Sequence, residues 1–411
     1  MLLFLMLKRV GWTELSFHLP SAYGLAIWLA VSLLLMLAPK EWGGVNGVAI
    51  ATSSFVAFSY LTSNIIFSKV KLINKIALCR RENHLGLGVV FLVIGVFGAV
   101  SNIIELFGVI SSAGIDFVLI TGEVLRREAA NVESIGQQIS YFGWFGACVV
   151  LSCLEFARSG LKKFICIALI VFLVLIEFSQ MNRMRVIWLI VMLSYSVIRV
   201  RGFSVIYFAF LSSTVFFVFI ISGVMTNKIN SINVMDLFYS SFLQVAAYLI
   251  GGVLYFVDEL GGIEDSGFSF ENTLRPAYKV LYALGLRPHP PASGILDFKA
   301  VAGELVTNVG SFLLSFVNDF GSVGIVVAIV FYTLFVDLIF VYLHKKKKVV
   351  VVPLMASLIF IALMSPFASQ HESMAFIFIF VLSLGVYVIH GMIAFVRSIF
   401  IKSIEFSQGR L

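Results

Sequence analysis

The sequence contains few charged residues. Asp, Glu, Lys and Arg make up 12% of its 411 residues, whereas soluble domains carry roughly 25%. Hydrophobic residues make up 60%, and apolar runs close to the ~20 residues needed to cross a bilayer recur along the whole chain. These two features exclude a water-soluble globule and predict an all-α, polytopic integral membrane protein.

Cysteine is scarce, and the common nucleotide and metal motifs are absent. Three of the four cysteines lie in apolar runs and Cys79 lies in a basic loop, so no disulfide framework and no zinc site is predicted. The chain has no Walker sequence, no H-E-x-x-H, no G-x-S-x-G and no D-x-D. These absences count against ATP-driven transport and against metal- or serine-dependent hydrolysis. We expect no metal and no cofactor.

The apolar runs predict about ten transmembrane helices. The candidate spans are Ala22–Ala38, Val45–Phe67, Leu85–Ile110, Ile139–Ala157, Phe164–Phe178, Val186–Ile198, Phe203–Gly223, Phe320–Leu343, Val349–Met364 and Met374–Val396. With this even number, all the main basic clusters between spans fall on one face, which the positive-inside rule makes cytoplasmic. These clusters include Lys345 to Lys348, and both termini are then cytoplasmic.

The spans divide the chain into three regions: a seven-span region 1–223, a large outer-face loop 224–317, and a three-span region 318–411. Phe238–Val257 is apolar enough to cross, but crossing would require a second, weakly apolar passage near Val301–Val317. A charged residue at the centre of a membrane helix makes the free energy of insertion less favourable by ~2.5–3.5 kcal/mol, whereas one Leu or Phe makes it more favourable by only ~0.3–0.6 kcal/mol. We therefore expect an interfacial or re-entrant helix there. Asp337, near the lysine run, is expected at the cytoplasmic interface.

Several basic residues fall on the predicted outer face, where orientation signals do not explain them. They are Arg126, Arg127, Arg183, Arg185, Lys228, Arg275, Lys279, Arg287 and Lys299. Arg183 and Arg185 occupy a loop of a few residues, so we expect them at the membrane surface, where they need an anion. Two interpretations stay open: contact with lipid head groups or an ion pair with Glu177, or binding of a substrate phosphate by the planar guanidinium.

The stretch RPAYKVLYALGLRPHPP, residues 275–291, combines basic residues with four of the eight prolines. Its first half has apolar residues at helical spacing and predicts a short amphipathic helix on the bilayer, with Arg275 and Lys279 on the polar side. The prolines predict a rigid, extended turn around His289, and histidine is the residue type that most often acts as a general base. His371, in the loop SPFASQHES, is the second candidate for that role.

The stretch TNVGSFLLSFVNDFGSVGIVVAIVFY, Thr307 to Tyr332, resembles the bacterial O-antigen polymerase family. Its members carry an Asn, an aromatic-rich run, an acidic residue and a Gly-x-x-Gly before a late span, matched here by Asn308, Phe312, Phe316, Asp319, Gly321 and Gly324. The family's mid-chain arginine matches Arg183 or Arg185, and Tyr248 to Glu259 is similar to a stretch before the family's periplasmic loop. Related O-antigen ligases have a His just before the Asn, where Thr307 stands here.

The resemblance implies a C-type glycosyltransferase of the bacterial inner membrane, with its active site facing the periplasm. It would transfer a growing glycan from undecaprenyl pyrophosphate to the next lipid-linked repeat unit. The implied partners are this lipid-linked oligosaccharide as donor and acceptor, membrane lipid and a chain-length regulator protein, with no nucleic acid.

The expected catalytic residues are Arg183, Arg185, Arg275, Arg287 and His289, and the expected substrate-binding residues are Arg126, Arg127, Lys299, Asn308, Asp319 and Tyr248. In this scheme the arginines bind the pyrophosphate leaving group, on which negative charge develops as the glycosidic bond breaks. His289 or Asp319 orients or deprotonates the acceptor hydroxyl, and an aromatic-rich groove takes the prenyl chain.

Two other functions remain open. An O-antigen ligase differs only in its acceptor. A flippase or transporter for lipid-linked glycans predicts polar residues near the middle of several spans, whereas Glu105 and Glu155 lie toward span ends.

Overall fold

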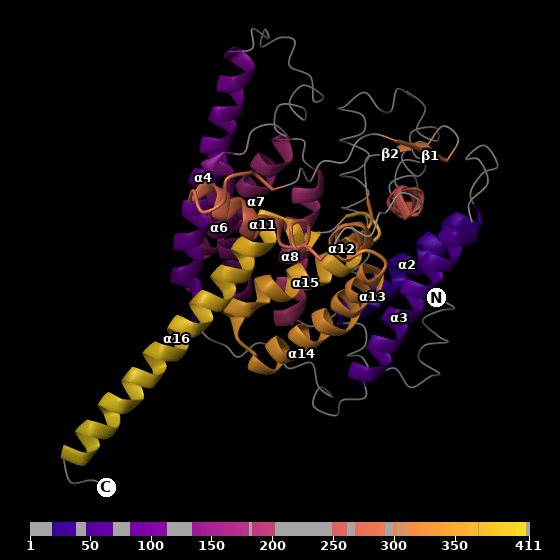
Figure 1. Ribbon diagram of the computed structural model, residues 1–411. Coiled ribbons are helices and arrows are strands. Elements are labelled where there is room, and N and C mark those ends of the chain that lie inside the picture. Colours follow the sequence, from indigo (N-terminus) through magenta and orange to yellow (C-terminus); the bar gives the residue numbers. More distant parts are fainter. Residues whose placement is uncertain are drawn as a thin grey trace.

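A computed structural model of the chain describes residues 19–37, 47–68, 83–112, 134–180, 183–201, 249–260, 268–291, 299–302, 305–307, 310–368 and 370–407. This part of the chain is mostly helical (Figure 1). The helices of ten or more residues named in Figure 1 are α2 (Pro20–Met36), α3 (Gly47–Ser68), α4 (Leu85–Ser112), α6 (Ile135–Ser152), α7 (Gly160–Ser179), α8 (Arg183–Arg201), α14 (Val336–Lys346), α15 (Val352–Met364) and α16 (Met374–Ser407).

The predicted spans coincide with these helices wherever the structure describes them, and Phe203–Gly223 lies outside the described residues. Four described helices are long and apolar enough to cross a membrane: Gly47–Ser68, Leu85–Ser112, Val323–Lys346 and Met374–Ile393. Pro20–Met36 and Val349–Met364 are shorter apolar helices. The described architecture is that of an all-α membrane protein.

Helices α4 and α6 approach each other closely because glycines line both contact surfaces. Gly88, Gly95 and Gly98 of α4 face Gly136, Gly143 and Gly146 of α6. A Cβ added at Gly95 would overlap the backbone of Gly143, and one added at Gly98 would lie 2.6 Å from the Ile139 side chain. Small residues permit such close backbone approach, which is the usual source of attraction between helices in lipid.

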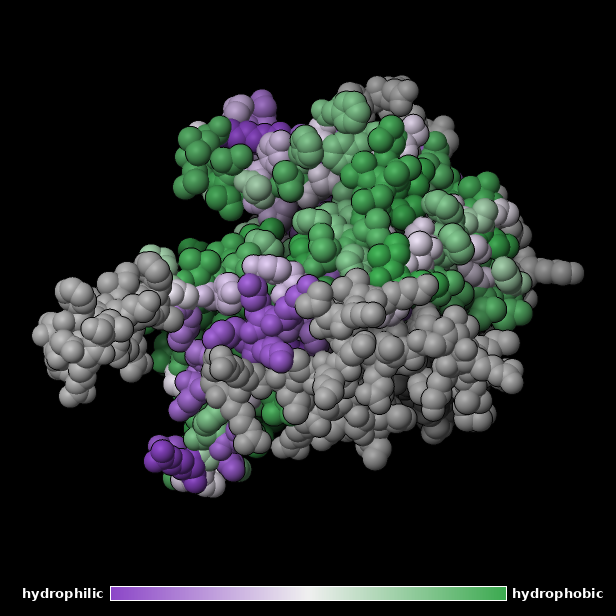
Figure 2. Space-filling model, turned by 90° about the horizontal axis from the view of Figure 1, so that it is seen from below, coloured by the Kyte–Doolittle hydropathy of each residue, from purple (hydrophilic) through white to green (hydrophobic). Residues whose placement is uncertain are grey.

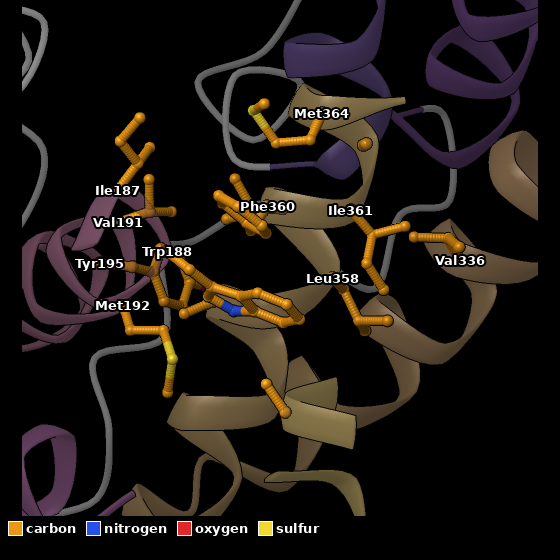
Figure 3. Close-up of a cluster of buried hydrophobic side chains, with 14 of the residues drawn as sticks. Ile187, Trp188, Val191, Met192, Tyr195, Val336, Leu358, Phe360, Ile361 and Met364 are labelled. Atoms are coloured by element: carbon orange, nitrogen blue, oxygen red, sulfur yellow. The ribbon is translucent and has the colours of Figure 1, made fainter. Parts of the chain in front are cut away.

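Helices α8 and α15 pack through a large aromatic pair (Figure 3). The Trp188 and Phe360 rings stack at a centroid distance of 4.5 Å, and the Trp188 indole N–H donates to Ser357 Oγ at 3.2 Å. Tyr195 lies further along α8, with its ring 6.1 Å from that of Phe340 on α14. These buried side chains pack α8, α14 and α15 together around one interior cluster.

Helix α12 (Phe312–Phe320) is a buried half-helix that turns directly into the long helix Val323–Lys346. Its nine residues span only about 14 Å. Gly321 ends α12 at φ 58°, a conformation that favours glycine, and the next helix, α13 (Val323–Val330), follows at once. A Cβ on Gly324 would overlap the Phe316 carbonyl. The first residues of α12 belong to the region 224–317 that the sequence assigned to an outer-face loop, and they are buried in the bundle.

The buried N-terminus of α12 is held by backbone groups of two other segments. Phe312 N–H donates to the Ser365 carbonyl at 2.9 Å, and Ser311 N–H donates to the Gly252 carbonyl at 3.1 Å. Gly252 belongs to a helix over residues 249–260 whose apolar residues are largely buried. The described part of Phe238–Val257 is therefore an internal helix, while residues 238–248 lie outside the described part.

The described chain also contains a short amphipathic helix and a pair of strands. Helix α11 (Arg275–Ala283) forms in the predicted amphipathic stretch. Strands β1 (Lys299–Ala302) and β2 (Leu305–Thr307) pair antiparallel, a hairpin that the helical reading of the sequence did not predict.

The glycine contact predicts a position-specific stability effect. We expect Gly95→Ala to destabilise the protein by about 1–3 kcal/mol, because the methyl meets backbone atoms that cannot move aside. Gly108→Ala on the same helix is the matched control, since a Cβ there meets nothing within 4 Å. Unfolding midpoints of the purified variants in detergent measure both effects, and equal midpoints would contradict the packing.

Candidate functional site

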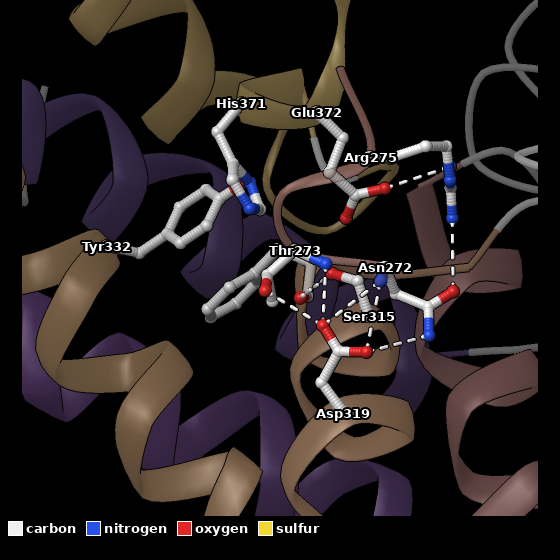
Figure 4. A network of polar contacts seen from close by, with 9 residues as sticks. Asn272, Thr273, Arg275, Ser315, Asp319, Tyr332, His371 and Glu372 are labelled. Atoms are coloured by element: carbon white, nitrogen blue, oxygen red, sulfur yellow. Dashed lines mark hydrogen bonds and ion pairs between the residues drawn. The ribbon is translucent and has the colours of Figure 1, made fainter. Parts of the chain in front are cut away.

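The Asp319 carboxylate is the centre of a buried polar network at the end of α12 (Figure 4). It accepts hydrogen bonds from the Asn272 and Thr273 backbone N–H groups at 2.7–3.1 Å. The Asn272 amide, the Thr273 hydroxyl and the Ser269 hydroxyl donate to it at 2.8–2.9 Å. One carboxylate therefore fastens residues 269–273 to α12.

The environment of Asp319 favours its ionised form. Burial alone raises the pKa of this carboxyl, but the hydrogen bonds from Thr273 and Asn272 outweigh burial and hold the pKa below its usual range. Donors thus surround both oxygens, and Asp319 serves as an anchor for the 269–273 segment rather than as a free base.

Arg275 connects this segment to the loop between α15 and α16. Its guanidinium forms an ion pair with Glu372 at 3.0 Å and donates to Asn272 Oδ1 at 3.3 Å. The Arg275 side chain is 15% exposed and that of Glu372 is 7% exposed. Among the described residues, Arg275 Nε is buried and has no hydrogen-bond partner.

His371 is buried beside this ion pair, in contact with Tyr332 (Figure 4). Its Nδ1 lies 2.8 Å from Tyr332 Oη, and its ring contacts those of Phe316 and Phe331, at centroid distances of 5.2 and 5.4 Å. Burial, followed by the charge of Arg275, lowers the pKa of His371 to about 3, so the imidazole is neutral at pH 7. Its Nε2 has no partner within the described chain.

Tyr332 reaches His371 from a π-helical turn, Phe331–Phe335, within the long helix Val323–Lys346. Such turns are rare and occur frequently at functional sites. Asp319, Arg275 and His371 form one cluster at the end of the bundle opposite Lys345–Lys348. The long helix Val323–Lys346 begins beside Asp319, and the lysines lie at its other end.

Arg287 forms a second partly paired cation close to the first. It forms an ion pair with Glu271 at 2.9 Å, and its guanidinium carbon lies 4.5 Å from the Tyr278 ring centroid. The side chain is 23% exposed, and its Nη1 has no partner in the described part. His289 is exposed, two residues further along the proline-rich turn.

Lys299 is already paired with acids. Its ammonium contacts the Glu259 carboxylate and lies 3.6 Å from Asp258, and the Tyr255 ring lies beneath it at 5.5 Å. These contacts join β1 to the 249–260 helix, so a substrate role for Lys299 would compete with its acidic partners.

Arg185 is buried inside the bundle and paired with Glu177, which is one of the interpretations that the sequence left open. The side chain is buried between α6, α7 and α8, where its Nη2 lies 2.9 Å from Glu177 Oε2 and donates to Ser140 Oγ at 2.8 Å. Trp144 Nε1 donates to the same Glu177 carboxylate at 3.0 Å. Of the interpretations offered for this arginine, the ion pair with Glu177 is the one observed. Arg183 is the first residue of α8.

Asp337, the acid that the sequence placed near the lysine run, is also buried inside the protein. It accepts the Ser21 backbone N–H at 3.0 Å and the Ser63 hydroxyl at 2.8 Å, and it is fully buried. The carboxylate therefore caps the N-terminus of α2, where a helix dipole favours negative charge.

Four of the expected site residues lie outside the described residues: Arg126, Arg127, Tyr248 and Asn308. Sequence reasoning missed Asn272, Thr273 and Glu372 as partners of Asp319 and Arg275. The sequence signal that could have pointed to them is proximity: Asn272 and Thr273 lie just before Arg275, and Glu372 follows His371. No group of three or more potential metal ligands occurs among the described residues.

Comparison of the chain with protein-family models, with curated proteins and with solved structures gave no match.

The ion pair inside the bundle predicts a large single-mutant effect. Glu177→Gln should destabilise the protein by roughly 3–5 kcal/mol, because it leaves the Arg185 guanidinium buried without an anion. The double variant Glu177→Met/Arg185→Met should lose much less than the sum of the single effects. Unfolding midpoints in detergent give the coupling, and additive single losses would contradict a mutually dependent pair.

The neutral His371 predicts a pH effect on stability. Because folding lowers its pKa from 6.5 to about 3, its contribution is fully present above pH 6.5 and is lost as the pH falls toward 3. The slope is at most about 1.4 kcal/mol per pH unit. His371→Gln should flatten the profile between pH 6.5 and 4. Parallel profiles for wild type and His371→Gln would contradict the buried neutral imidazole.

Proposed function

We propose that this protein is a glycan polymerase of the O-antigen type, a membrane glycosyltransferase. It would transfer a growing glycan from undecaprenyl pyrophosphate to the terminal sugar hydroxyl of the next lipid-linked repeat unit. The observation that carries the proposal is one cluster that unites the family-like Asp319 with Arg275 and His371, three residues from distant parts of the chain.

The position of the cluster supports an outer-face site. It lies at the end of Val323–Lys346 opposite the four lysines, which the positive-inside rule assigns to the cytoplasm. With about ten spans in the whole chain, both termini are cytoplasmic and the cluster faces the periplasm of a bacterial inner membrane. Lipid-linked repeat units joined on that side would meet it at the bilayer surface.

Arg275 and Arg287 suit a diphosphate leaving group. Each uses part of its guanidinium for an acid, Glu372 or Glu271, and each retains a nitrogen without a partner among the described residues. Arginine binds phosphate oxygens through two parallel donors. Charge grows on the pyrophosphate as the sugar–oxygen bond breaks, so these contacts strengthen in the transition state and lower the barrier.

His371 is better placed than His289 to orient the acceptor hydroxyl. Tyr332 fixes its Nδ1, and the ring is neutral and adjoins Arg275 and Glu372, whereas His289 is exposed on the proline-rich turn. In the reaction, the acceptor oxygen bonds to the sugar anomeric carbon, and the electron pair of the broken bond leaves with the pyrophosphate. The hydroxyl proton passes to an oxygen of the departing pyrophosphate, while the neutral His371 orients the hydroxyl by accepting its hydrogen bond. His371 Nε2 is buried in this structure and has no hydrogen-bond partner among the described residues.

The same segment offers an apolar surface for lipid. Several of its large apolar side chains are exposed, which a bilayer or a prenyl chain would cover. They are Phe268, Phe270, Leu274, Val280, Leu281, Leu284 and Leu286.

The proposal predicts polymer formation from a single substrate. Purified protein in lipid nanodiscs, given only an undecaprenyl-pyrophosphate repeat unit, should produce a ladder of longer glycans and release undecaprenyl pyrophosphate. A ligase would need a lipid A core as acceptor, and a transporter would leave the substrate unchanged. Either result would replace the polymerase assignment.

Within that assay, Arg275→Gln and Arg287→Gln should each lower kcat by about 100-fold or more, the usual scale for loss of a transition-state charge contact. His371→Gln should reduce the rate more than His289→Gln, and Lys162→Gln, far along the chain on an exposed helix start, is the control. Full activity of both arginine variants would show that the cluster does not hold the leaving group.

A further inference from the structure

Helix α8 carries a buried arginine near each end, and only one of them has an acidic partner in the described chain. Arg185 is paired with Glu177 at 2.9 Å. Arg199, near the other end, is 3% exposed, and its Nη1 lies 3.1 Å from the His344 Nδ1. Its Nε and Nη2 have no partner among the described residues.

A permanently charged guanidinium needs a counter-charge when it is removed from water. The carbonyl ends of α8 and α14 supply part of it, because each helix C-terminus carries about half a negative charge. Arg199 lies two residues before the end of α8, and His344 lies two residues before the end of α14. The remaining guanidinium edge still has donors to offer to an anion.

More positive charge follows directly after His344. The run Lys345–Lys348 begins at the last turn of α14, and Lys347 ends that helix in the left-handed conformation, at φ 53°. Lys345 and Lys347 are exposed, and hydrophilic residues gather on the face of the molecule seen from below (Figure 2). On the flank of α14, Leu338 and Tyr342 are both 54% exposed, an apolar strip next to the cations.

We infer that this end of α8 and α14 binds the phosphate of an anionic phospholipid from the leaflet that faces the lysine run. Arg199 supplies the buried guanidinium, Lys345 and Lys347 supply exposed positive charge, and the Leu338–Tyr342 strip contacts an acyl chain. Basic pockets between membrane helices are a recurring mode of anionic lipid recognition. The inference does not rest on the proposed enzymatic function, since the site lies at the opposite end of the bundle from Asp319.

Native mass spectrometry of delipidated protein tests this site. Titration with phosphatidylglycerol should give one tight lipid adduct that phosphatidylcholine does not reproduce. Arg199→Gln should weaken that adduct about fivefold or more, the scale for one basic contact at a membrane surface. Arg199→Lys keeps the charge but loses the planar guanidinium. Its affinity for the lipid should lie between those of the wild type and Arg199→Gln. Thermal unfolding with each lipid is the second readout, with a rise in the midpoint expected only for phosphatidylglycerol.

The double variant Lys345→Gln/Lys347→Gln provides the test if Arg199→Gln does not fold, because both lysines are exposed. It should also weaken the phosphatidylglycerol adduct. Lys162→Gln/Lys163→Gln is the matched control, since it removes two exposed charges from the start of α7. Equal binding of the two lipids, or an equal loss in the control, would overturn the inference. Displacement of the lipid by millimolar inorganic phosphate or pyrophosphate would identify a soluble anion as the ligand and would also overturn it.

Discussion

A carboxylate inside an apolar bundle is stable only when donors surround it, and Asp319 obtains its donors from the short segment 269–273. That requirement fixes the position of residues 269–273 and of the segment that follows them. It sets the start of α11, it directs Arg275 toward Glu372, and it thereby brings the loop that carries His371 against the half-helix α12. The site is a consequence of satisfying one buried charge.

The same rule accounts for polar groups elsewhere in the bundle. Glu177 neutralises Arg185, Asp337 caps α2, and the Ser365 hydroxyl accepts hydrogen bonds from Trp28 and Tyr60. Each contact joins segments that are distant in sequence. Glycines perform the complementary task between α4 and α6, where close backbone packing substitutes for the hydrophobic attraction that lipid cannot provide. Polar pairs and glycines together determine which helices become neighbours.

Hydropathy predicted the helices well because crossing a bilayer constrains length and composition so strongly. It predicted α4 and α16 nearly to their first residues, and it identified the amphipathic α11. Hydropathy did not predict α12, because this apolar helix has only nine residues and is too short to be recognised as a membrane span. Charge reasoning offered Glu177 as one partner of Arg185, and the structure shows that ion pair. It did not foresee the partners of Asp337, because Ser21 and Ser63 are distant from it in the sequence. Asp319 and Arg275 were predicted from local pattern, but their connection through Asn272 was not.

The measurement that bears most directly on the role of the Asp319–Arg275–His371 cluster is photo-crosslinking with an undecaprenyl-pyrophosphate sugar that carries a diazirine on its first residue. Peptide mapping should place the crosslinks within residues 268–291 and 365–373, and unlabelled donor should abolish them. Crosslinks confined to the ends of α8 and α14 beside Lys345–Lys348, or crosslinks that unlabelled donor does not displace, would contradict a donor site at this cluster.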